Sequence, residues 1–133
     1  MPRSHRPLPP GGVALSALFG ASGLLHLLRP RVFEGIIPTP LRRHRRLLVL
    51  GSGVAELACA AGMVHPATRA PAGLASAGLL VAVFPANVQM SLTLGRRAAR
   101  RRTVRSWTGF AVSLARLPVQ VPLIRAALGV GGR

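Results

Sequence analysis

Four apolar segments alternate along the chain with segments crowded with arginine. Charged side chains are almost absent from residues 12–28, 47–63, 72–94 and 107–130, which are 17, 17, 23 and 24 residues long. A helix rises about 1.5 Å per residue, so about 20 apolar residues cross a hydrocarbon layer of about 30 Å. The pattern predicts an all-α integral membrane protein with four transmembrane helices. Because the connections are short, we expect an up-and-down four-helix bundle.

The predicted helices take up most of the 133 residues. We expect a single four-helix domain over residues 12–130. A basic, proline-rich tail that we expect to be disordered precedes it at residues 1–11, and a short tail follows at residues 131–133.

The distribution of charge predicts an orientation in the membrane. The formal charge of +16 comes from 18 arginines, because the chain has no lysine, and twelve of them lie in residues 29–46 and 95–106. These two connections must lie on the same side of the membrane, and the opposite side carries only four arginines. The positive-inside rule therefore predicts a multi-pass protein of the inner or plasma membrane, with both connections cytoplasmic and both termini outside. We expect these arginines to contact anionic lipid headgroups, and we do not expect nucleic acid as a partner.

Strongly polar side chains inside the predicted helices define a candidate intramembrane site: Glu56, Asn87, Arg116, Gln120 and, nearer a helix end, His26. A charged group at the centre of a span costs about 2.5–3.5 kcal/mol, so such groups usually face the interior and find partners. Glu56 and Arg116 both lie about 13 Å from the cytoplasmic ends of their helices, whereas His26 lies only about 3 Å from the end of its helix. The matching depths predict an ion pair between Glu56 and Arg116, with Asn87 and Gln120 completing the hydrogen bonds.

Three prolines lie inside the predicted third and fourth helices, at Pro85, Pro118 and Pro122. Each is expected to kink its helix, since proline removes a backbone donor and leaves a carbonyl one turn earlier without its usual partner. For Pro85 and Pro118 these carbonyls belong to Val81 and Leu114. Kinks beside the polar residues would open a small cavity there. The polar site then either lines a pocket for a small redox or lipid-like molecule, or fixes helix order and register without a ligand.

Cysteine and histidine limit the chemistry that the chain can support by itself. Cys59 is the only cysteine, so no disulfide or dithiol can form within one chain. His5, His44 and His65 fall in predicted loops or tails, so we expect neither a haem with two axial histidines nor another metal site. No flavin or dinucleotide fingerprint is present. The sequence therefore leaves open whether the protein is an enzyme.

Four motifs occur in order over residues 15–125: a histidine in the first helix followed by RPRVFEGIIP, then SGVAE, FPANVQM and RLPVQ. Together they resemble the DoxX family of small bacterial membrane proteins. The resemblance implies a four-helix membrane protein with distant similarity to the DoxD subunit associated with thiosulfate:quinone oxidoreduction. It also implies quinone as a cofactor and another membrane or redox protein as a partner. The positions that match the family motifs are His26, Pro30, Phe33, Pro38, Ser52, Gly53, Glu56, Pro85, Asn87, Met90, Arg116, Pro118 and Gln120.

On this basis we expect an accessory or quinone-proximal component of a membrane redox or oxidative-stress assembly, with Glu56 and Arg116 carrying the proton or substrate hydrogen bonds. The alternative is a non-catalytic membrane scaffold or chaperone in which the buried ion pair is structural. A third reading is a small transporter. It needs a continuous polar path, and residues 57–63 and 72–81 provide almost no polar groups for one.

Overall fold

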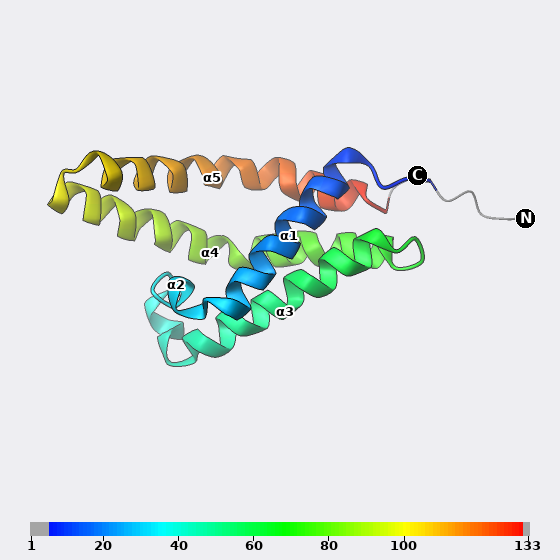
Figure 1. Ribbon diagram of the computed structural model, residues 1–133, viewed down its shortest axis with the longest axis horizontal. Helices are drawn as coiled ribbons and strands as arrows, with labels where there is room; N and C mark the ends of the chain where they lie inside the picture. Colours follow the sequence, from blue (N-terminus) through cyan, green and yellow to red (C-terminus); the bar gives the residue numbers. More distant parts are fainter. Residues whose placement is uncertain (1–5, 132–133) are drawn as a thin grey trace, which may run out of the picture.

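Four long helices make up most of residues 6–131, the part of the chain that this computed structural model describes (Figure 1). Residues 1–5 of the predicted tail and residues 132–133 lie outside the described residues. Two short helices connect the first and second long helices, and no strand occurs between residues 6 and 131. In chain order the helices are α1 (Pro10–Leu28), α2 (Pro30–Glu34), the 3-10 helix η1 (Thr39–His44), α3 (Arg45–Val64), α4 (Arg69–Arg101) and α5 (Val104–Gly129).

The long helices pack on their neighbours in the sequence. α1 packs on α3, α3 on α4 and α4 on α5, while a smaller contact between α1 and α5 closes the bundle. All four are long and apolar enough to cross a membrane. Large apolar side chains remain exposed on each of them, including Val13, Val54, Leu74 and Val121, as lipid-facing surfaces require. The predicted all-α, multi-pass, four-helix architecture is confirmed.

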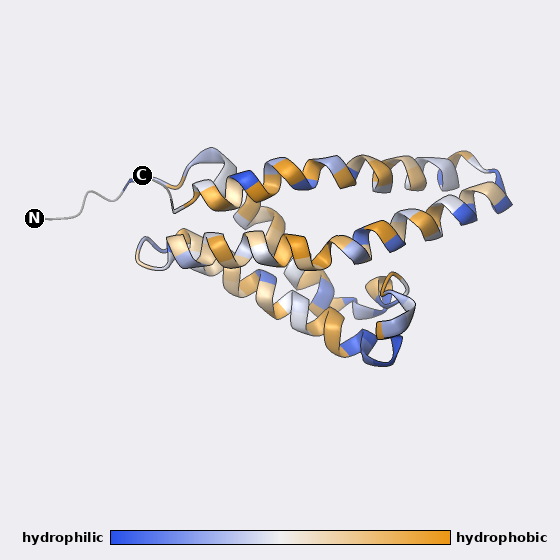
Figure 2. Cartoon of the chain, turned by 180° about the vertical axis from the view of Figure 1, so that it is seen from behind, coloured by the Kyte–Doolittle hydropathy of each residue, from blue (hydrophilic) through white to orange (hydrophobic). Residues whose placement is uncertain are grey.

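The buried core lies at the end of the bundle where α3 joins α4. Leu15, Phe19, Met63, Leu80 and Val130 belong to this cluster, and Leu15 and Met63 have no exposed surface. Toward the opposite end the α4–α5 hairpin diverges from the α1–α3 pair, and the two views in Figures 1 and 2 agree on this. Tight packing is therefore concentrated at one end of the molecule.

The α4–α5 hairpin is longer than the predicted spans. α4 has 33 residues and continues to Arg101 rather than ending near residue 94, and α5 begins at Val104 rather than at residue 107. Lack of charge marks the part of a helix that suits lipid, but arginine and alanine also favour helix, so the helices continue beyond the apolar windows. At about 1.5 Å per residue, α4 is about 50 Å long and exceeds the thickness of the hydrocarbon layer.

A two-residue turn, formed by Arg102 and Thr103, replaces the predicted connection 95–106. Arg102 has a left-handed backbone with φ 50°. Thr103 caps α5: its hydroxyl accepts from the Ser106 backbone N–H at 3.2 Å, and its own backbone N–H donates to the Ser106 hydroxyl at 3.2 Å. This capping box satisfies donors that would otherwise be free at the start of α5.

The arginine-rich segments 29–46 and 95–106 lie at the same end of the bundle, the end that includes the hydrophilic tips in Figure 2. The first segment contains α2 and η1 rather than an irregular loop, and Glu34 pairs with Arg45 at 3.3 Å to join α2 to the start of α3. The relative placement agrees with the four-span topology. Which side of the membrane this end faces stays a prediction.

Candidate functional site

His26 on α1, which is half-buried, and Glu56 on α3, which is buried, lie next to each other. The His26 Nδ1 atom lies 3.4 Å from Glu56 Oε2 and 2.7 Å from the Ser22 backbone carbonyl. A carbonyl can only accept, so Nδ1 carries the hydrogen and donates it to the Ser22 carbonyl. The imidazole also stacks on the Phe33 ring, with centroids 3.9 Å apart and ring planes at 19°. Glu56 itself is 6% exposed, and its Oε2 has no hydrogen-bond partner among residues 6–131. The contact with His26 is therefore electrostatic rather than a full hydrogen bond.

Two glycines let α1 and α3 approach closely enough for this contact. A Cβ atom at Gly23 would lie 2.8 Å from the Gly53 carbonyl oxygen, and one at Gly53 would lie 2.8 Å from the His26 Cβ. His26 and Glu56 each follow their glycine by three residues, one turn further along the same helix face. Because Cα–Cβ bonds tilt toward a helix N-terminus and these helices run antiparallel, the two side chains lean back toward the crossing point and meet there.

The expectation that His26 lies apart from Glu56, at a shallower depth, is wrong. It requires α1 to end at the membrane surface. In the structure α1 is followed at once by α2, which packs against both α1 and α3 and places Phe33 over the histidine ring. The protein therefore continues past the C-terminal end of α1 on the side of His26, and counting residues from Leu28 does not measure depth. The paired spacing of Gly23 with His26 and of Gly53 with Glu56 is the sequence signal that could have identified this contact.

A second polar contact joins α4 to α5. The Gln120 side-chain amide donates to the Leu80 carbonyl, and its carbonyl oxygen accepts from the Asn87 amide at 3.4 Å. Gln120 is 6% exposed, so both ends of a buried amide have partners. The bonded carbonyl precedes the expected Val81 carbonyl by one residue, in the turn that leads to Pro85. α4 continues as helix through Pro85, and α5 does so through Pro118 and Pro122. The size of any kink stays a prediction.

The predicted ion pair between Glu56 and Arg116 is not formed. Among residues 6–131 the two side-chain ion pairs are His26 with Glu56 and Glu34 with Arg45, and the Arg116 guanidinium makes no hydrogen bond. α3 packs on α1 and α4, and α5 packs on the same two helices, so α3 and α5 lie diagonally across the bundle. Equal depth does not make two residues neighbours. Arg116 is exposed.

The structure thus divides the five candidate residues into a His26–Glu56 pair, an Asn87–Gln120 pair and a solvent- or lipid-exposed Arg116. That they form one working site stays a prediction. Among the described residues no three His, Cys, Asp or Glu side chains are grouped as metal ligands are, and Cys59 is buried and free. Two cavities, of about 340 and 400 Å³, are lined by residues at the arginine-rich end.

These features define a multi-pass helical membrane protein with polar residues buried between its helices. The chain belongs to the family described as "Domain of unknown function (DUF8561)", whose model matches residues 15–131. The resemblance to DoxX proteins is therefore wrong: its motifs are short, and small residues, prolines and single polar residues recur in unrelated helical membrane proteins. No curated protein and no solved structure matches the chain.

Proposed function

We propose that this chain is a non-catalytic membrane scaffold that binds another membrane protein through the face of α5 around Arg116. The observation that carries the proposal is the exposure of Arg116 near the middle of an apolar helix, with no hydrogen bond or ion pair among the described residues. A guanidinium stays charged at any relevant pH and costs about 2.5–3.5 kcal/mol at the centre of a span. A carboxylate from outside the chain would offset that cost.

The small number of acidic side chains in this chain favours a different protein, rather than a second copy, as the partner. The chain has two acidic side chains. Glu34 is paired with Arg45, and Glu56 is buried beside His26. A second copy could provide a carboxylate to Arg116 only by giving up one of these pairs. We therefore propose a partner with an aspartate or glutamate inside a transmembrane helix.

The buried polar contacts support a structural role within the chain. His26 and Glu56 join α1 to α3, while Asn87 and Gln120 join α4 to α5. A transporter would need polar groups through both halves of the bundle, and the core at the α3–α4 end consists of side chains such as Leu15, Met63 and Leu80. The redox role and the quinone followed from the DoxX resemblance, and no contact described above adds support for them.

Site-specific photo-crosslinking tests the proposed face. Val112 and Val119 flank Arg116 by one turn on α5 and are 58% and 48% exposed, so a photoreactive residue at either position samples this surface. Val54 on α3 is also 58% exposed and is the matched control. We expect crosslinks from the two α5 positions, and none from Val54, to one membrane protein with an acidic residue in a span.

A charge exchange then identifies the contact. Arg116→Glu should abolish the crosslink, and replacing the partner's acidic residue by arginine should restore it. Arg125→Glu, further along α5, should leave the crosslink unchanged. The proposal fails if Arg116→Glu crosslinks as the wild type does, or if the positions on α5 and α3 capture the same proteins.

A further inference from the structure

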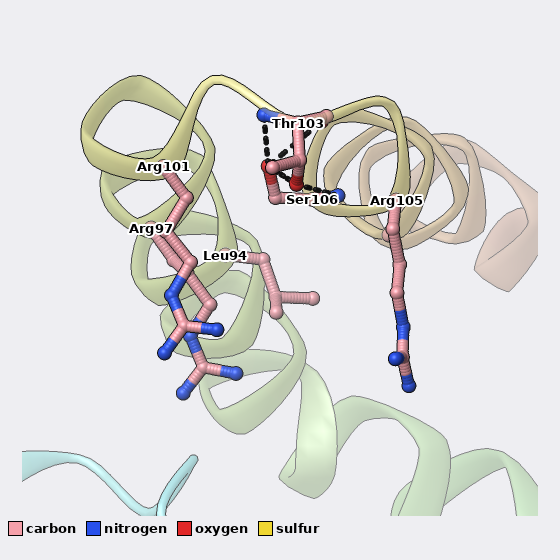
Figure 3. A pocket seen from close by; sticks show the side chains of 7 residues that line it. Leu94, Arg97, Arg101, Thr103, Arg105 and Ser106 are labelled. Carbon is pink, nitrogen blue, oxygen red and sulfur yellow. Dashed lines mark hydrogen bonds between the residues drawn. The ribbon is translucent and has the colours of Figure 1, made fainter.

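Six arginines surround two adjoining cavities at the end of the α4–α5 hairpin. The cavity of about 400 Å³ is lined by Gln89, Thr93 and five arginines, which are Arg42 of η1 and Arg96, Arg97, Arg100 and Arg101 of α4. The cavity of about 340 Å³ shares Arg97 and Arg101 and adds Arg105 of α5. Figure 3 shows the guanidinium groups of Arg97 and Arg101 next to each other, with Arg105 across the cavity from them. Three separate elements thus direct positive charge into one region.

None of the described residues that line the two cavities carries a negative charge. Neither cavity is lined by a carboxylate, and the two glutamates pair elsewhere, with Arg45 and His26. Like charges held together repel, and the repulsion is stronger beside a low-dielectric membrane than in bulk water. The Thr103–Ser106 capping box fixes the backbone at the start of α5, from which the exposed Arg105 side chain extends. The region is electrostatically complementary to an anion.

We propose that the two cavities together form a binding site for a phosphate group. Guanidinium groups bind phosphate through pairs of parallel charge-assisted hydrogen bonds, and several arginines converging from different helices suit its negatively charged oxygens. Arg97 and Arg101 line both cavities and are therefore the central residues of the site. Arg42 approaches from η1 and links the α1–α3 half of the molecule to the hairpin through the ligand.

The larger cavity is also lined by two neutral polar side chains, Gln89 and Thr93. Gln89 and Thr93 lie one to three turns before the arginines on α4, toward its apolar part. The Thr93 hydroxyl donates to the Gln89 carbonyl at 2.9 Å and lies 3.3 Å from the Gln89 side-chain nitrogen, which fixes both side chains against the helix. The remaining N–H of the Gln89 amide is a neutral donor beside the cations, and an ester carbonyl of a phospholipid glycerol could accept from it. A free phosphate would use the same arginines without the Gln89 amide.

Native mass spectrometry of the full chain in mild detergent tests the site. The protein is incubated with phosphatidic acid, with phosphatidylcholine and with inorganic phosphate, and the bound adducts are counted. We expect one phosphatidic acid to remain bound while phosphatidylcholine, whose headgroup has no net charge, is lost. Because each charge-assisted bond is strong, Arg97→Gln with Arg101→Gln should weaken the retained adduct by about tenfold or more.

A second double variant separates the site from general attraction to positive charge. Arg43→Gln with Arg46→Gln removes the same charge from residues that line neither cavity, so binding should change less than about twofold if geometry matters. Retention of inorganic phosphate with no preference among lipids would support the site and identify a soluble phosphate as its ligand. Binding that falls equally in both double variants, or no adduct with any of the three probes, would overturn the proposal. The proposed phosphate site is independent of the proposed partner at Arg116, because the two proposals rest on different residues.

Discussion

The crossing of α1 and α3 gives a quantitative prediction for Gly53→Ala. The added Cβ would lie 2.8 Å from the His26 Cβ and 3.0 Å from the Gly23 carbonyl oxygen. Carbon atoms pack best at about 3.5–4.0 Å, so the helices must separate by about 0.7–1.2 Å. Neither neighbouring atom is the end of a flexible side chain. Overpacking of this kind typically costs about 1–3 kcal/mol.

Gly51→Ala is the matched control, on the same helix two residues earlier. Gly51 is exposed, and a Cβ there would meet no atom within 4 Å. Both substitutions gain the same helix propensity, about 1 kcal/mol, so the difference between them isolates the crossing. We expect Gly53→Ala to have a free energy of unfolding about 1–3 kcal/mol lower than that of Gly51→Ala, measured by steric trapping in bicelles. Equal stability of the two variants would show that α1 and α3 do not cross at these glycines, and the His26–Glu56 contact would lose its basis.

Three further predictions concern the polar contacts. His26→Leu leaves a buried glutamate without its partner and should lower the free energy of unfolding by about 3–5 kcal/mol. Adding Glu56→Leu should recover most of this loss. A double variant that is no more stable than His26→Leu would contradict the pairing. Gln120→Leu removes the donor to the Leu80 carbonyl and should cost about 0.6–1.7 kcal/mol by the same assay, so no loss of stability would argue against that bond. Thr103→Ala removes the cap of α5 and should cost about 1 kcal/mol locally, seen as faster amide hydrogen exchange in the first turn of α5. Unchanged exchange there would refute the capping box.

The architecture could be predicted because a membrane strongly restricts the structures that a spanning segment can adopt. Absence of charge over about 20 residues is sufficient to identify a span, and all four spans were found in this way. Helix ends were predicted less well, because arginine at residues 96 and 97 ends an apolar window without ending a helix. The turn at Arg102 and Thr103 depends on a local cap, which the hydropathy pattern does not report.

The contacts within the candidate site were harder to predict than the residues that belong to it. The sequence indicates how deep each residue lies along its helix. It does not indicate which helices are adjacent or which faces they turn toward each other. Arg116 and Glu56 have similar expected depths and lie on diagonal helices, so they do not pair. His26 was misplaced because α2 extends the protein beyond the end of α1. Asn87 and Gln120 do meet, since they lie on consecutive helices that form a hairpin.

Because the bundle packs unevenly, the α4–α5 hairpin is anchored near one end and free at the other. The anchor is the apolar cluster that contains Leu80, and Arg101 lies 21 residues further along α4, about 32 Å away at the helical rise. A rotation of α4 by only about 5° about this cluster would therefore displace Arg101 by about 3 Å, the length of one hydrogen bond. A small rearrangement among the tightly packed side chains of this cluster would thus be magnified into the making or breaking of contacts at the arginine-rich end.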